Sequence, residues 1–195
     1  GQLALDLSRS RDLGPASPLH FLGPAPRLLP NADIARFARD TCDLSAPVAD
    51  IICQLGLALH GAMTFDATAT DVDTDAAEAF SKRRGVCQDF SHIMIIALQS
   101  LGIPSGYVSG FLRTLPPPGG VKLEGADAMH AWVRAWCGAA QGWVEYDPTN
   151  ATLVGTDHIV VAFGRDYSDV SPVIGHLRSS GAQVNSQAVD MAVVD

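Results

Sequence analysis

The sequence lacks an apolar stretch long enough to cross a bilayer, a run of Lys and Arg, and a pair of cysteines spaced as CxxC. The first absence argues against a membrane protein, and the second, with a formal net charge of −8, argues against a nucleic-acid or anionic-membrane partner. Four unpaired cysteines in 195 residues suit neither a disulfide scaffold nor a zinc site, and fit a reducing cytosol. We therefore predict a cytoplasmic protein with no membrane or nucleic-acid partner.

The N-terminus, residues 1–6, has neither the basic flank nor the continuous hydrophobic segment of a targeting signal. It begins with Gly rather than Met, so we expect that an upstream segment has been removed. A hydrophobic content of 47% is ample for the core of one domain. Alternation over residues 2–7 predicts a short strand, followed by a Pro/Gly-rich connector to residue 30, and the main domain spans residues 31–195.

One stretch combines a cysteine with the start of a strongly apolar helix. Apolar residues recur at helical spacing from Phe90 to Leu101, and Gly102 followed by Pro104 ends the helix. Cys87 therefore falls in the first turn, where unpaired backbone N–H groups and the helix dipole favour the reactive thiolate. A free cysteine is more often a small buried hydrophobe, so its position alone leaves both interpretations open.

Two further helices are predicted before this one. Asn31 can cap the first, and Pro47 opens the second, which ends near His60. We interpret His60 as structural, because a protonated imidazole suits the C-terminal end of a helix.

Residues 71–82 resemble the opening of a calcium loop, with carboxylates at alternate positions. The remainder does not fit, because Ala76 stands where the turn requires Gly and Lys82 where a bidentate Glu should close the shell. A short helix capped by Thr74 or Asp73 explains the same residues. We therefore predict no metal or cofactor here.

The second half of the chain is predicted to be rich in strands, at residues 105–114, 129–136, 142–147, 157–163 and 188–194. The second and third of these form a hairpin. A loop at residues 137–140 pairs Trp136 with Gln141, and the same register places His130 opposite Asp147. Side chains directly opposite each other have Cβ atoms about 5 Å apart, which allows a carboxylate to hydrogen-bond an imidazole.

Acyl transfer through a thiol needs a nucleophile, a base, and a group that orients the base. Cys87, His130 and Asp147 are of the right types for these three roles. Each also has an ordinary explanation, since His130 can be a satisfied strand histidine and Asp147 can lead into the turn at Pro148. A zinc site with the same three residues lacks an obvious fourth ligand. His92, His158 and His176 have no partner that the sequence identifies.

Three motifs occur in an order that resembles the transglutaminase-like superfamily, specifically the bacterial branch assigned as cysteine proteases. These are residues 84–90 (RGVCQDF), 130–132 (HAW) and 146–150 (YDPTN), and the resemblance covers most of residues 45–175. It implies an α+β, papain-like fold, with the cysteine at the N-terminus of a central helix packed on an antiparallel sheet. It also implies that residues 31–195 form a catalytic domain, with Cys87, His130 and Asp147 as its triad. We place three further residues in an oxyanion or substrate pocket: Gln88, Trp132 and Tyr167.

The resemblance narrows the function to a class of reactions. Members of the superfamily crosslink or hydrolyse amides, or have lost activity, so the fold does not fix the reaction. We predict a thiol-dependent acyl-transfer enzyme that acts on a protein or peptide through an acyl-enzyme thioester, with hydrolysis slightly favoured over transamidation. The alternative is a catalytically silent binding or scaffold module.

Two departures limit the carry-over from the family. Animal transglutaminases use calcium, for which the incomplete loop at residues 71–82 gives no support. Papain-type enzymes place an oxyanion-hole Gln shortly before the nucleophile, but residues 79–86 contain none, so the second oxyanion donor is unassigned. Bacterial relatives usually have a β-rich domain ahead of this core, which is consistent with a chain that begins without Met.

Overall fold

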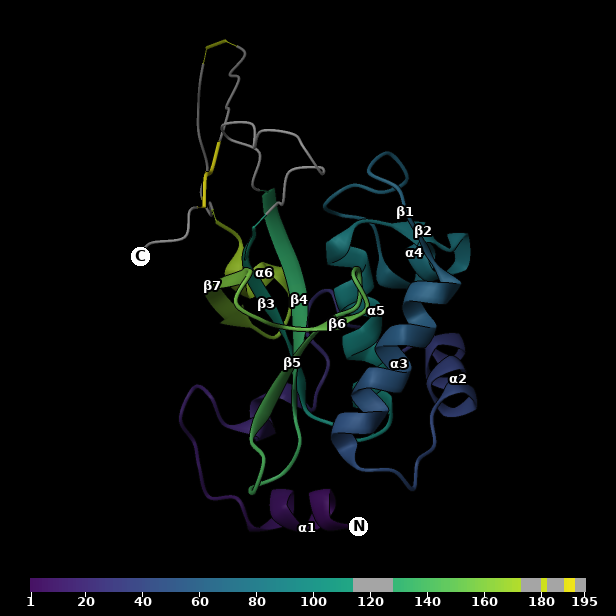
Figure 1. The fold of residues 1–195 in the computed structure, drawn as a ribbon, viewed down its shortest axis with the longest axis vertical. Coiled ribbons are helices and arrows are strands. Elements are labelled where there is room, and N and C mark those ends of the chain that lie inside the picture. The colour runs from purple at the N-terminus through teal and green to yellow at the C-terminus, as the bar shows by residue number, and fades with distance from the viewer. Residues whose placement is uncertain (114–127, 173–179, 182–187, 192–195) are drawn as a thin grey trace.

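A computed structural model describes residues 1–113, 128–172, 180–181 and 188–191. Helices form one layer of the molecule and an antiparallel sheet forms the other (Figure 1). The helices of that layer are α2 (Ala32–Thr41), α3 (Val48–Ala62), α4 (Ala76–Lys82) and α5 (Cys87–Ser100). Three further helical segments are α1 (Gln2–Arg9), the 3-10 helix η1 (Pro18–Phe21) and α6 (Tyr167–Val170).

The main sheet has the strand order β6-β5-β4-β3-β7, and every neighbouring pair is antiparallel. Its strands are β3 (Ser105–Leu112), β4 (Ala128–Trp136), β5 (Trp143–Asp147), β6 (Thr152–Leu153) and β7 (His158–Gly164). Two short strands, β1 (Thr64–Phe65) and β2 (Arg84–Gly85), pair in parallel just before α5. The predicted α+β fold, with Cys87 at the start of a helix packed on an antiparallel sheet, is confirmed.

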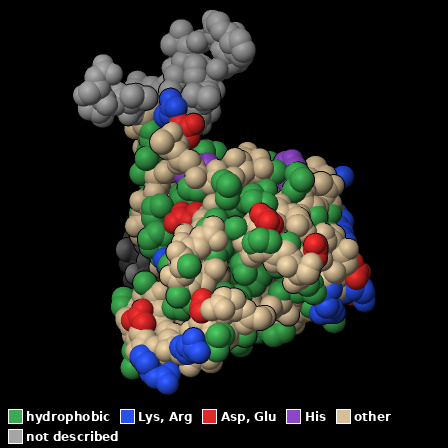
Figure 2. All heavy atoms as spheres, turned by 60° about the horizontal axis from the view of Figure 1, so that its bottom comes forward, with side chains coloured by type: hydrophobic (Ala, Val, Ile, Leu, Met, Phe, Trp, Pro, Cys, Tyr) green, Lys and Arg blue, Asp and Glu red, His purple; other side chains and the backbone are tan. Residues whose placement is uncertain are grey.

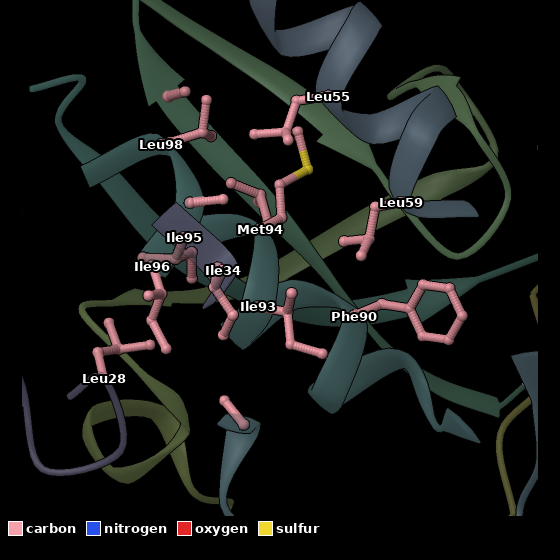
Figure 3. Close-up of a cluster of buried hydrophobic side chains, with 14 of the residues drawn as sticks. Leu28, Ile34, Leu55, Leu59, Phe90, Ile93, Met94, Ile95, Ile96 and Leu98 are labelled. Carbon is pink, nitrogen blue, oxygen red and sulfur yellow. The ribbon is translucent and has the colours of Figure 1, made fainter. Parts of the chain in front are cut away.

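The core is built around α5, whose residues 88–98 are all buried. From Ile93 to Leu98 the helix is apolar on every side, because it is surrounded by protein rather than lying on the surface. Leu55 and Leu59 of α3 pack from one side, while Ala131 and Val133 of β4 belong to the same cluster (Figure 3). At roughly 25 cal/mol per Å² of apolar surface removed from water, this cluster is the main source of the stability of the fold.

The predicted strand at residues 2–7 is wrong, because residues 2–9 form α1. The alternation of leucines is also compatible with a helix, and the amide of Gln2 hydrogen-bonds the carboxylate of Asp6 one turn later, at 2.6 Å. Asp6 also accepts from the backbone N–H of Ala139 at 3.0 Å, which attaches α1 to the β4–β5 loop. An isolated strand in this place would have left its backbone groups without a partner.

The predicted cap of α4 is also wrong, because Asp75 rather than Thr74 or Asp73 caps this helix. Oδ1 of Asp75 accepts from the N–H of Ala77 at 2.8 Å. The hydroxyl of Thr74 is engaged with the Asp71 carboxylate instead, at 3.1 Å. The carboxylate of Asp73 pairs with Arg27 at 2.8 Å, so a contact far away in the sequence decides its role.

The structure also differs from the predicted strands and loops in the C-terminal part of the chain. The short strand β6 was not anticipated, and a turn of helix, α6, lies in the segment expected to be a loop. Residues 188–191 are not in a strand, and residues 192–194 lie outside the described residues, as do Thr114, the Pro-rich loop at 115–120 and His176.

The distribution of Lys and Arg on the surface agrees with the absence of a basic run in the sequence. On the face in Figure 2, Lys and Arg side chains lie at the edges and form no continuous patch among the described residues. Within the part of the chain that the structure describes, no helix is both long and apolar enough to span a membrane.

Candidate active site

Cys87 is the first residue of α5, as predicted. Gly85 lies in the turn before it, at a point with no room for a side chain, because a Cβ would stand 2.5 Å from Oδ2 of Asp89. That oxygen accepts hydrogen bonds from the backbone N–H of Val86 at 2.7 Å and from the hydroxyl of Thr70 at 2.6 Å. These contacts fix the turn from which the partly exposed thiol of Cys87 projects.

The first turn of α5 also presents backbone donors beside the thiol. Asp89 and Phe90 donate the first hydrogen bonds of the helix, both to the carbonyl of Val86. The N–H groups of Cys87 and Gln88 precede these bonds, and N–H groups in the first turn of a helix point out of its end. An anion at this position would meet both groups together with the positive end of the helix dipole.

His130 lies on β4 and Asp147 ends β5, and the two side chains meet. Nε2 of His130 is 2.7 Å from Oδ2 of Asp147. The thiol of Cys87 lies near enough to the same imidazole to help raise its pKa. Because Asp147 occupies Nε2, the nitrogen left for the thiol is Nδ1. The three residues that the sequence singled out therefore gather at one site.

The predicted hairpin register is wrong by two residues. Trp136 pairs with Trp143 rather than with Gln141, because the loop is longer and uses Gly138 and Gly142 at positive φ. A shift of two residues keeps every side chain on the same face of the sheet, whereas a shift of one would not. Asp147 therefore lies diagonal to His130 rather than directly opposite it, and the predicted contact between the two side chains still forms.

The carboxylate of Asp147 is fully buried and accepts five hydrogen bonds. Its Oδ1 accepts from the backbone N–H groups of Thr149 at 2.9 Å and Asn150 at 3.1 Å. Its Oδ2 accepts from His130, from Nδ2 of Asn150 at 2.7 Å and from Nε2 of His158 at 3.1 Å. A buried carboxylate costs much free energy unless such donors surround it, so the charge and orientation of Asp147 are well defined.

These contacts shift the pKa of both partners. Burial alone would lower the pKa of His130, but the hydrogen bonds with Asp147 and Cys87 outweigh burial and raise the pKa to about 9. Burial alone would raise the pKa of Asp147, but the bond from His130, aided by Asn150 and His158, lowers it to about 2. Near neutral pH the pair is an imidazolium beside a carboxylate, which suits a histidine that holds the proton of a thiol.

Of the other residues predicted to line the pocket, Trp132 lies near His130, whereas the side chain of Gln88 points elsewhere. Trp132 is fully buried near His130, with their ring centroids 6.1 Å apart, and its Nε1 donates to Glu145 at 2.7 Å. The side-chain amide of Gln88 is directed away to the carbonyl of Val72, at 3.0 Å.

Tyr167, which is partly buried, belongs to an aromatic group with the buried residues His92 and Tyr107. Its ring lies 6.2 Å from that of Tyr107, and its backbone N–H donates to Nε2 of His92 at 3.2 Å. Burial lowers the pKa of His92 to about 4, so this imidazole is a neutral acceptor. Burial, and then the charge of Cys87, raises the pKa of Tyr107.

Sequence reasoning missed two residues that contact Asp147. Asn150 was within reach of prediction, because an Asp followed by Pro, Thr and Asn is a recognisable turn in which the Asp side chain accepts backbone N–H groups. His158 was not, because β7 is separated from β5 by two strands of the sheet. His60, predicted to be structural, supports the same turn, since its Nδ1 lies 2.9 Å from the carbonyl oxygen of Thr149.

His130, Asp147 and His158 offer three ligand atoms within 4.8 Å of one another, which is a number that zinc can use. Their present arrangement is one of hydrogen bonds, since Nε2 of each histidine faces Oδ2 of Asp147. Moreover, Nδ1 of His158 accepts from the N–H of Gly155 at 3.4 Å, so its Nε2 carries the proton rather than a free lone pair. These hydrogen bonds explain why the three side chains lie close together, and a bound ion is not needed to explain it.

Comparison with known proteins identifies the family to which the core corresponds. The family model described as the transglutaminase-like superfamily matches residues 36–148. An uncharacterised protein of Mycobacterium tuberculosis is 36% identical over 150 residues, which is 75% of this chain and 47% of that protein. An uncharacterised protein of Mycobacterium leprae is 44% identical over 114 residues, covering 58% of this chain and 39% of its own. The chain thus spans about half the length, or less, of these relatives.

Solved structures agree on the fold. The "putative cysteine protease" of Cytophaga hutchinsonii superposes with a TM-score of 0.66 at 21% identity, over 99% of this chain and 63% of that one. The periplasmic domain of TgpA from Pseudomonas aeruginosa, bound to ethylmercury, gives a TM-score of 0.51 at 21% identity, over 72% and 51% of the two chains. At such identities the likeness concerns the fold alone.

Proposed function

The chain belongs to the transglutaminase-like superfamily, whose members are typically enzymes, and from this premise we propose that it is a thiol-dependent acyl-transfer enzyme. One observation carries the proposal: the imidazole of His130 is bonded to Asp147, and Cys87, at the N-terminus of α5, lies near enough to help raise the pKa of that imidazole. The substrate class is a protein or peptide, with Cys87, His130 and Asp147 as the reacting and orienting groups.

In the proposed reaction, the proton of the Cys87 thiol already resides on His130, and the thiolate of this ion pair attacks the carbonyl carbon of an amide. The oxyanion that forms lies beside the backbone N–H groups of Cys87 and Gln88 at the helix terminus, which supply stabilisation where charge develops. His130 then returns the proton to the leaving amine, the C–N bond breaks and a thioester remains on Cys87. Asp147 keeps the imidazole oriented and stabilises its positive charge in both steps.

The second half of the cycle decides the type of enzyme. If water attacks the thioester, the protein is a hydrolase or protease, and if a primary amine attacks, it is a transglutaminase. We favour hydrolysis, because no feature of the described residues excludes water or selects an amine. Incubation with a glutamine-containing acyl-donor peptide and a fluorescent primary amine separates the two, because only a transferase attaches the label covalently.

The primary test is the rate at which iodoacetamide alkylates Cys87 as a function of pH, with the modified residue located by mass spectrometry. We expect reaction to persist well below pH 8.5, the value at which an ordinary thiol is about half ionised. The same experiment on His130→Ala should return Cys87 to ordinary thiol behaviour, because the group that holds its proton is gone.

Cys137 provides an internal control, since burial raises its pKa to about 11 and it should react slowly in both proteins. If Cys87 followed an ordinary thiol profile and His130→Ala changed nothing, the enzymatic proposal would be abandoned. The chain would then be interpreted as the alternative, a silent binding or scaffold module.

A further inference from the structure

A second histidine, which lies on a strand at the edge of the sheet, contacts Asp147. His158 begins β7, which is separated from β5 by β3 and β4. Its Nε2 nevertheless lies 3.1 Å from Oδ2 of Asp147, the same oxygen that faces His130. Two histidines from different strands therefore converge on one carboxylate oxygen.

The surroundings of His158 define which nitrogen is the donor. Its Nδ1 accepts from the backbone N–H of Gly155 at 3.4 Å, which requires a lone pair on Nδ1. In a neutral imidazole the proton is then on Nε2, and this nitrogen faces Asp147. His158 is accordingly a hydrogen-bond donor to the carboxylate rather than a competing base.

The ring of His158 is also held in place. Its side chain is 6% exposed, and it packs edge-on against Trp132 with the ring centroids 5.1 Å apart. Trp132 itself is fully buried and is tied to Glu145 through Nε1. Because both rings are fixed by packing, the donor of His158 has a defined position relative to Asp147.

We propose that His158 is a positioning residue, which holds the Asp147 carboxylate so that Oδ2 faces His130. This inference rests on the proposed thiol mechanism, because its effect on Cys87 passes through Asp147 and His130. Oδ1 is anchored by the backbone of Thr149 and Asn150, but these bonds act on the other oxygen. His158 and the Asn150 amide are the groups that act on Oδ2 besides His130 itself among the described residues.

Two variants separate hydrogen bonding from packing. His158→Phe keeps a ring against Trp132 but has no donor, whereas His158→Gln loses the ring but carries an N–H at about the place of Nε2. The measured quantity is the second-order rate constant for iodoacetamide alkylation of Cys87 at pH 6. Matched controls are His20→Phe and His20→Gln, since His20 is an exposed residue of η1 remote in sequence from the site.

We expect His158→Phe to lower the rate constant about tenfold, as for loss of one hydrogen bond to a charged group, and His158→Gln to stay within about threefold of the native protein. The His20 variants should match the native protein. The inference is overturned if His158→Phe reacts at the native rate, or if only His158→Gln is impaired, because packing would then be the sole role.

A second measurement tests the contact without any reactivity. Two-dimensional ¹⁵N NMR of the histidine rings at pH 8 should find His158 with its proton on Nε2, and the opposite tautomer would overturn the inference. The same experiments distinguish a failure of the proposed function from a failure of the role proposed for His158. A native Cys87 that reacts like an ordinary thiol removes the proposed function and this role together, whereas an activated Cys87 unaffected by His158→Phe removes only the role of His158.

Discussion

At the scale of single residues, the functional character of this chain depends on how His130 and Asp147 change each other. Each would be electrostatically unfavourable if buried alone, because burial disfavours both an imidazolium and a carboxylate. Placed 2.7 Å apart, they stabilise the charged form of each other and move their pKa values in opposite directions. The stability of the fold should therefore depend on pH through the same two residues that we assign to the chemistry.

The pKa of His130 is about 9 in the folded chain and near 6.5 in an unfolded one. Its contribution is fully present below pH 6.5 and is lost as the pH rises through 9, because the unfolded chain releases the proton first. We expect the free energy of unfolding to fall by on the order of 1 to 3 kcal/mol between pH 6 and pH 9. Urea denaturation at the two pH values measures it.

The variant His130→Gln is the control for this prediction. Its free energy of unfolding should decline less over the same interval, because the titrating group is absent. Equal declines in the two proteins would contradict the assignment. Asp147 makes the free energy of unfolding depend on pH in the acid range as well. Its stabilising contribution is present above pH 3.8 and is lost as the pH falls through about 2.

At the scale of secondary-structure elements, the start of α5 determines where the thiol lies. The two-stranded β1–β2 pair and the Asp89 carboxylate hold the turn that precedes Cys87. Gly85, the last residue of β2, has no space for a side chain, because the Asp89 side chain occupies the place of its missing Cβ. A substitution here tests whether the geometry of the turn is needed for reactivity.

We expect Gly85→Ala to destabilise the protein by about 1 to 3 kcal/mol, as an overpacked site does, and to slow alkylation of Cys87. The added methyl would displace Asp89 and release the N–H of Val86. Thermal unfolding and the alkylation rate measure the two effects.

Gly61→Ala is a matched control on α3, where a Cβ meets nothing within 4 Å. It should stabilise the helix by about 0.5 to 1 kcal/mol, because Ala loses less conformational freedom than Gly. If both variants behaved alike, crowding at Gly85 would not be the cause.

At the scale of the whole molecule, the N-terminal connector is joined to the C-terminal part of the core. Leu28 is 1% exposed and belongs to the central cluster. The backbone N–H of Arg27 donates to the fully buried Asp166 at 2.7 Å, and its guanidinium lies over the ring of Tyr167. Segments about 140 residues apart thus meet beside Tyr167.

We expect Asp166→Ala to cost about 1 to 3 kcal/mol, because it leaves the N–H groups of Arg27 and Ser168 without their acceptor. For a chain of this length, each kcal/mol lowers the melting temperature by roughly 2 to 4 °C. Calorimetry measures the change, and Asp33→Ala, at an exposed position, is the comparison that should change it little. Equal melting temperatures for the two variants would mean that the connector contributes nothing through this contact.

The sequence by itself determined the features that depend on local pattern. The apolar period and the Gly-Pro end defined α5, so Cys87 could be placed in its first turn. Alternation in β4 placed His130 and Trp132 on one face and Ala131 on the other. Side-chain direction in a strand has a period of two, so even a register error of two residues preserved the His130–Asp147 contact.

Only the tertiary structure decided the contacts between segments that are distant in the sequence. His158 reaches Asp147 across the sheet, Asp73 pairs with Arg27 instead of capping α4, and residues 2–9 form a helix attached through Asp6. Propensity and spacing carry no information about which segments meet, because such pairings are set by the packing of the whole chain. The local pattern therefore supplied the candidate chemical groups, and the fold supplied the neighbours that charge, orient and restrain them.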